Sequence, residues 1–448
     1  MLKAPQLFRE IMRNAAILIG GRATNAVVAL AALATASRSL GLEGFGLLVV
    51  INAFAEAVGD FVKFQSWQTV LSYGAGHLHE DGGPELQRVL RFSFVLDLIS
   101  GVAGVAVGVI GVGIAAPWLK LPPELTGAAT LYATCVGFMV SATPSGVLRL
   151  YGRFGLLAGQ INLQSTVWLL GGLVAAATHA GVAGFLVVWW LGNLSAFLFL
   201  FVAAWRELHR RGALNGFDWR AGHLTRGFPG IWRFAMTTNA NATIELTFNH
   251  VSTLLVGGLL NPPQAALWRV AKQIADAVAA PAAMVVNALY PEFAKLRASG
   301  DHHTIGKIAA RVIVIMGGLA TMILVICTFA GGPVLGLFMG KAFVVAGPVL
   351  TWLVGASVIG VWAAPLEPIL VSIGRPGVIF RSRSVAAAIY LLMLWPVIRM
   401  FGLSGAGAGM VIAQLATGTG MLVGVMHWYR DPRTGLAPPA PPKPKAVG

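Results

Sequence analysis

The chain has 448 residues, of which 56% are hydrophobic and only 11% are charged, and its mean hydropathy is +0.75. These values exclude an ordinary soluble protein. The net charge of +15 would suit a nucleic-acid partner, so the places where the basic residues fall decide what that charge means.

Twelve mainly apolar stretches follow one another along the chain, and each is long enough to cross a bilayer core, which takes about 20 helical residues. They lie near residues 14–37, 44–72, 90–116, 126–148, 155–178, 181–204, 232–258, 265–291, 308–330, 343–371, 378–399 and 404–427. The sequence therefore predicts an all-α integral membrane protein with about 12 transmembrane helices.

The basic residues gather in alternate connecting segments. With the N-terminus inside, we count 24 of the 32 Lys and Arg residues in inside segments and 4 in outside segments, while the remaining 4 lie within helices. Because cytoplasmic loops carry the excess of Lys and Arg, both termini are expected in the cytoplasm. The charge thus indicates orientation and predicts no nucleic-acid partner.

The chain shows little sign of enzymatic or metal chemistry. Arg22 interrupts the apolar region that a cleavable signal peptide would need, so the first helix is expected to stay in the chain. Cys135 and Cys327 lie in separate apolar stretches and suggest neither a disulfide nor a metal site. Phosphate loops, nucleophile elbows and HExxH motifs are missing from the sequence, so we predict no catalytic residues, metal or cofactor.

Two parts of the sequence match at an offset of about 220 residues. Residues 40–58 align with 260–278, which sets Glu56 over Asp276, and residues 142–155 align with 363–377 around a proline and a Gly-Arg-x-Gly turn. Two six-helix bundles around a central cavity are therefore expected. The predicted domains are an N-terminal bundle (1–204), a basic cytoplasmic linker (205–231), a C-terminal bundle (232–427) and a Pro-rich cytoplasmic tail (428–448).

Ionisable side chains occur inside several apolar stretches, although each costs about 2.5 to 3.5 kcal/mol at the bilayer centre unless it faces protein or water. At 100° per residue, two sets of three each share one helix face. These sets are Glu56, Asp60 and Lys63, and Arg269, Lys272 and Asp276. A polar stripe on another helix contains Thr238, Asn241, Glu245 and Asn249, and Arg22 lies beside Asn25 in the first helix.

These charges have two interpretations at this point. They form structural ion pairs between or along helices, such as Lys272 with Asp276, or they line a water-filled cavity. A cavity with both cations and hydrogen-bonding side chains would suit an anionic, polyhydroxylated substrate, since Arg and Lys bind phosphate.

The segments RSLGLEGFGLL (38–48) and ALWRVAKQIADAVAAPAAMVVNALYPEFAKL (266–296), together with the 6+6 layout, resemble a known family. It is the polysaccharide transporter branch of the multidrug/oligosaccharidyl-lipid/polysaccharide exporter superfamily, which includes the bacterial O-antigen flippases. The resemblance covers roughly residues 10–430. It implies an inner-membrane flippase that moves an undecaprenyl-pyrophosphate-linked oligosaccharide across the membrane by alternating access, driven by an ion gradient.

The resemblance also implies roles for the membrane charges. The expected substrate-binding residues are Arg22, Asn25, Lys63, Asn241, Arg269 and Lys272, with Arg22, Arg269 and Lys272 at the pyrophosphate. The expected coupling residues, for protons or sodium, are Glu56, Asp60, Glu245 and Asp276, with Glu245 foremost. The implied partners are the lipid-linked oligosaccharide, membrane lipids, and a polysaccharide polymerase or glycosyltransferase as candidate protein partner.

Three other functions remain as alternatives. A cation-coupled multidrug exporter of the same superfamily would prefer an acidic cavity, which the cationic residues argue against. A membrane glycosyltransferase or polymerase would need a large outside loop with carboxylates, whereas the longest outside segments have only about 10 to 13 residues. A membrane scaffold in polysaccharide assembly could use the linker 205–231 or the tail segment APPAPPKPK (437–445).

Overall fold

A computed structural model of the chain describes residues 4–77, 83–216, 225, 228, 230–246, 250–298 and 302–430. Within these residues the regular structure is helical throughout, with no strand. Every predicted apolar stretch lies mainly in helices; two of them are broken, at residues 63–65 and 140–141, and residues 247–249 are outside the described part. This confirms the all-α membrane fold.

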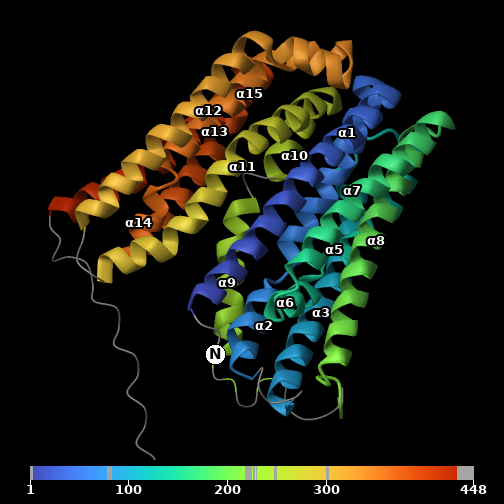
Figure 1. The fold of residues 1–448 in the computed structure, drawn as a ribbon. Helices are drawn as coiled ribbons and strands as arrows, with labels where there is room; N and C mark the ends of the chain where they lie inside the picture. Colours follow the sequence, from blue (N-terminus) through green and yellow to red (C-terminus); the bar gives the residue numbers. More distant parts are fainter. Residues whose placement is uncertain are drawn as a thin grey trace, which may run out of the picture. The chain divides into compact units, whose positions relative to one another are not determined.

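Residues 4–259 contain α1 to α10 (Figure 1). Their bounds are α1 (Ala4–Val62), α2 (Ser66–Gly74), the 3-10 turn η1 (Ala75–His77), α3 (Pro84–Ala115), α4 (Pro123–Ala133), α5 (Val136–Met139), α6 (Ala142–Leu150), α7 (Phe154–Ala177), α8 (Gly181–Arg210), α9 (Ile231–Leu246) and α10 (Ser252–Leu259). The remaining helices are α11 (Pro262–Ala298), α12 (His302–Met339), the 3-10 turn η3 (Lys341–Ala346), α13 (Gly347–Ala363), α14 (Leu366–Ser372) and α15 (Pro376–Arg430).

The helices form two compact units, residues 1–266 with 338–342, and residues 267–337 with 343–448. The first unit includes α9 and α10, whereas the sequence repeat assigns that segment to the second half. The proposed domain bounds at 204 and 231 stay a prediction. Residues 217–224 of the predicted linker and the tail 431–448 lie outside the described residues.

Sharp turns divide several long helices. Gly41 in α1 and Gly402 in α15 have φ values of 68° and 58°, a conformation that glycine adopts without strain, so each of these helices supplies two predicted spans. Positive φ recurs at the offset seen in the sequence: Lys120 and Gly340 are 220 residues apart, Gly181 and Gly402 are 221 apart, and Gly152 and Gly374 are 222 apart. The local turns therefore repeat as the sequence match does.

Two other spans are interrupted inside the first unit. The chain leaves helical structure between Val62 and Ser66, where α1 gives way to α2, and again at Val140 and Ser141 between α5 and α6. Breaks at such depth are tolerated only where protein or water satisfies the freed backbone groups. They are therefore the first places to look for a polar site.

Close packing of small residues holds α1 against α7, which lies between α1 and α8 in Figure 1. A Cβ on Gly21 would come within 2.6 Å of the Ala158 side chain, so only glycine allows this approach. Asn162 Nδ2 donates a hydrogen bond to the Gly21 carbonyl at 3.0 Å. Small residues and interhelical hydrogen bonds of this kind drive association where lipid removes the hydrophobic force.

The outward surface is apolar, as a lipid-facing surface must be. On α12, Val314, Met322 and Phe329 expose 64%, 54% and 82% of their surface. Seven helical segments of the described residues are individually long and apolar enough to cross a membrane. The protein is therefore a multi-pass membrane protein.

The predicted orientation can be tested with reporter fusions. Alkaline phosphatase fused after Arg211, which follows α8, is expected to be inactive because the positive-inside rule keeps that segment in the cytoplasm. A fusion after His179, in the turn between α7 and α8, is expected to be active. The reverse pattern of activity would show that the chain is inserted the other way up.

Candidate functional site

Four ionisable side chains meet in the first unit: Glu56, Asp60 and Lys63 from the second part of α1 and the break after it, and His250, just before α10. His250 Nδ1 lies 2.8 Å from Glu56 Oε2, and His250 Nε2 lies 3.3 Å from Asp60 Oδ2. Lys63 Nζ donates a hydrogen bond to Asp60 Oδ1 at 2.7 Å. These side chains expose between 19% and 32% of their surface, so the cluster is half-buried. We call it the acid–histidine cluster.

The charge of the acid–histidine cluster depends on one proton. Two carboxylates and Lys63 leave one net negative charge while His250 is neutral, and no net charge once His250 is protonated. Histidine is the side chain whose ordinary pKa lies in the physiological range. The net charge of the cluster therefore changes by one unit with the protonation of His250, which the two contacting carboxylates favour.

Sequence reasoning grouped Glu56, Asp60 and Lys63 but missed His250. On a regular helix His250 lies about 140° from Glu245, so it falls off the polar stripe that drew attention to that segment. The backbone at His250 and Val251 forms a π-helical turn, a feature often found at functional sites. The sequence signal that could have identified His250 is an ionisable histidine inside the apolar stretch 232–258.

A second buried group lies where the two broken spans meet. Asp97 of α3 exposes 7% of its surface, and its Oδ2 accepts a hydrogen bond from the Thr143 backbone N–H at 2.7 Å. This carboxylate caps the first turn of α6, which Ser141 does not cap. The Ser66 hydroxyl, at the start of α2, also lies against it. Asp97 thus satisfies one backbone N–H freed by the break before α6.

The cations of the first unit differ in their surroundings. Lys63 is paired with Asp60, as described above. Arg22 of α1 is exposed and close enough to Arg149 of α6 for the two charges to repel. Arg149 stacks over the Trp67 ring at 4.5 Å and donates to Ser145 Oγ at 3.3 Å. Among the described residues, no acidic partner is seen for Arg22 or Arg149. We call these two residues the arginine pair.

The other predicted site residues are placed as follows. Asn25 Oδ1 accepts a hydrogen bond from Ser165 Oγ at 2.6 Å, which links α1 to α7. Lys272 Nζ contacts both carboxylate oxygens of Asp276, at 3.0 and 2.9 Å. Arg269 is half-buried on the same helix. Asn241 and Glu245 lie on α9, but their side chains are outside the described residues, as is Asn249.

The contact between Lys272 and Asp276 favours the interpretation that these two charges form a structural ion pair, and this interpretation can be tested. Lys272→Gln is expected to lower the melting temperature, because Lys272 is 8% exposed and its removal costs the 2.9 Å pair in a partly desolvated place. Lys272→Gln with Asp276→Asn should recover most of the loss, since neither charge is then left alone. Thermal unfolding of the purified variants measures both. A loss in binding of a lipid pyrophosphate that the double variant does not recover would instead assign Lys272 to the substrate.

Comparison with known proteins places the chain among relatives. Residues 91–348 match the family model described as polysaccharide biosynthesis protein. The chain belongs to this family. It is also 31% identical over 339 residues to the inner membrane protein YghQ of Escherichia coli (strain K12), a match that covers 76% of this chain and 95% of YghQ.

Two solved structures have a similar fold. One is an inward-facing multidrug resistance MATE family transporter of the MOP superfamily, with a TM-score of 0.72 and 15% identity over 92% of this chain and 96% of that chain. The other is the lipid II flippase MurJ in an inward closed conformation, with a TM-score of 0.72 and 11% identity over 91% of this chain and 87% of that chain. This polysaccharide biosynthesis family member therefore has the fold of these transporters.

Proposed function

We propose that the protein is an inner-membrane flippase that translocates an undecaprenyl-pyrophosphate-linked oligosaccharide by alternating access, driven by an ion gradient. The family membership supports a role in polysaccharide assembly, and the fold supports transport. The observation that carries the substrate class is Arg149, which lies over the Trp67 ring with no acidic partner among the described residues and with a second cation, Arg22, near enough to interact with it electrostatically.

The arginine pair suits a pyrophosphate. Two like charges held close together repel each other, and a dianionic group between them would relieve that repulsion. Arg binds phosphate oxygens through a planar fork of donors, and here the Arg149 guanidinium lies over the Trp67 ring at 4.5 Å. Arg269 remains a further candidate for the anion on α11, with Lys272, Lys63, Asn25 and Asn241 as weaker ones because the first three already have partners in the structure.

The acid–histidine cluster suits coupling to a proton gradient. A flippase driven by protons needs a group that changes charge at ordinary pH during the cycle, and fixed charges cannot supply this. Protonation of His250 removes the net charge of the cluster. A neutral cluster would cost less free energy in a conformation of the transport cycle that excludes water from the cluster. We therefore assign coupling to Glu56, Asp60 and His250, with Glu245 and Asp276 as the remaining candidates.

The test of this function is reconstitution. Purified protein in proteoliposomes is given a lipid-linked oligosaccharide in the outer leaflet and an imposed proton gradient, and the accessible fraction is followed with a glycan-modifying enzyme. Gradient-dependent movement is expected. Movement of a cationic drug under the same gradient, with none of the lipid-linked glycan, would support the multidrug antiporter instead. Movement of neither would leave a scaffold role in polysaccharide assembly.

A further inference from the structure

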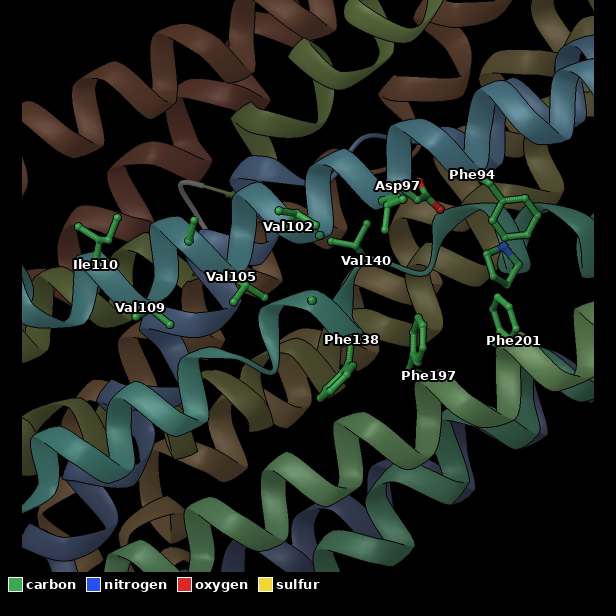
Figure 2. A pocket seen from close by; sticks show the side chains of 15 residues that line it. Phe94, Asp97, Val102, Val105, Val109, Ile110, Phe138, Val140, Phe197 and Phe201 are labelled. Carbon is green, nitrogen blue, oxygen red and sulfur yellow. The ribbon is translucent and has the colours of Figure 1, made fainter. Parts of the chain in front are cut away.

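An apolar groove runs along α3 on the first unit, between α3 and the segment formed by α5, α6 and α8. It has a volume of about 710 Å³. Figure 2 shows Phe94, Phe197 and Phe201 toward one end, Phe138 in the middle, and Val102, Val105, Val109 and Ile110 following along α3 toward the other end. Leu98, Val102 and Ile110 of its lining expose 67%, 65% and 65% of their surface, so the groove opens sideways toward lipid. We call it the α3 groove.

We infer that the α3 groove binds the polyprenyl chain of the lipid-linked substrate. This inference rests on the proposed function, because that substrate supplies the chain. Moving a lipid chain from the bilayer to a protein surface gains no hydrophobic free energy, because both surroundings are apolar. Binding must therefore come from shape complementarity and van der Waals contact. The α3 groove offers both, since its floor is closed in by backbone and its wall by aromatic rings.

The length of the α3 groove favours a polyprenyl chain over a phospholipid. Phe94 and Ile110, which line it near its ends, are 16 positions apart, about 24 Å of helix at 1.5 Å per residue. One leaflet of the hydrocarbon core is about 15 Å thick. A phospholipid acyl chain stays within its own leaflet and would fill only part of the groove. A chain that follows it throughout has to cross the midplane, as a long isoprenoid can.

The floor and wall provide the contacts. Gly101 of α3 and Gly137 of α5 both line the groove, and a Cβ on Gly101 would lie 3.6 Å from the Gly137 carbonyl oxygen, so backbone forms the floor here. Phe138, Phe197 and Phe201 form a continuous aromatic wall, with ring centroids 5.8 and 6.0 Å apart along it. Flat ring faces suit the planar double bonds of an isoprenoid.

The residues that line the α3 groove do not suit the pyrophosphate headgroup of the substrate. Among the residues that line it, Asp97 is the charged one, at the Phe94 end. Its Oδ2 is bonded to Thr143, while its Oδ1 has no hydrogen-bond partner among the described residues. None of the lining residues is a Lys or Arg that could bind a pyrophosphate. The groove is therefore a site for the chain alone.

The experiment fills the groove and measures lipid selectivity. Ala106 and Ala103 are both exposed on α3, but only Ala106 lines the groove. The full-length Ala106→Trp and Ala103→Trp proteins are placed in nanodiscs of phosphatidylethanolamine and phosphatidylglycerol. Binding of fluorescent undecaprenyl phosphate, geranyl phosphate and phosphatidylglycerol is measured. Ala106→Trp is expected to weaken undecaprenyl phosphate binding about tenfold, with Ala103→Trp close to wild type.

Two results would overturn the inference: unchanged undecaprenyl phosphate binding by Ala106→Trp, or an equal loss for geranyl phosphate and phosphatidylglycerol, which would make the groove an ordinary lipid contact. If Ala106→Trp lowers the melting temperature, Val102→Trp, at another exposed lining position, repeats the test. The inference and the function fail separately. Wild-type protein that binds undecaprenyl phosphate in the groove but moves no glycan refutes only the flippase function, and glycan transport unaffected by a filled groove refutes only the chain site.

Discussion

Arg149→Gln is expected to weaken binding of a lipid pyrophosphate by about 10-fold to 150-fold. A hydrogen bond between charged groups contributes about 1.5 to 3 kcal/mol, and in the proposed site Arg149 makes one to the pyrophosphate. Arg22→Gln should weaken binding by a similar factor, because in the proposed site the two arginines share the anion. Binding of undecaprenyl pyrophosphate to purified protein in nanodiscs measures both variants.

Arg210→Gln is the matched control for the loss of one positive charge. Arg210 exposes 68% of its side chain and lies 3.7 Å from Glu207, which Arg153 and Arg211 contact more closely, so its removal should leave both binding and fold intact. Arg149→Lys keeps the charge but loses the planar fork and should bind with intermediate affinity. If Arg22→Gln and Arg149→Gln both bind like wild type, the anion site lies elsewhere, and Arg269 is the next residue to change.

His250→Gln is expected to uncouple transport from the proton gradient. One charge moved through a potential of 100 mV is worth about 2.3 kcal/mol, so loss of one coupled proton lowers the accumulation ratio at that potential by up to about 50-fold. The variant also leaves Glu56 and Asp60 without their shared partner, which should cost about 1 to 3 kcal/mol of stability. Proteoliposome transport at fixed pH gradients and thermal unfolding report these two effects separately.

The double variant Glu56→Gln with His250→Gln distinguishes coupling from structure. It leaves Asp60 with Lys63, at 2.7 Å, and restores charge balance, so stability should return toward wild type. Driven transport should stay lost, because the group that exchanges the proton is missing. If the double variant regains driven transport along with stability, the acid–histidine cluster is structural, and Glu245 becomes the leading candidate for coupling.

The local features of this site follow from the sequence. Glu56, Asp60 and Lys63 share one face because a helix turns 100° per residue, and the contact between Asp60 and Lys63 confirms that geometry. The same reasoning brings Lys272 to Asp276 at four residues' spacing. For both pairs, however, the helical spacing alone does not tell whether the lysine faces a substrate or pairs with the carboxylate on its own helix. Either arrangement places the lysine on the same helix face.

The sequence by itself determined that the chain is an all-helical membrane protein and where its spans lie. Each span is recognised from its own run of about 20 mainly apolar residues, whatever the rest of the fold. Only the tertiary structure decided which charges meet. His250 joins Glu56 across more than 190 residues, Asp97 caps a helix formed 46 residues later, and Arg22 approaches Arg149 from another helix. These contacts depend on helix packing and on breaks at positions 63–65 and 140–141, whereas the hydropathy of the sequence predicts one continuous span across each break.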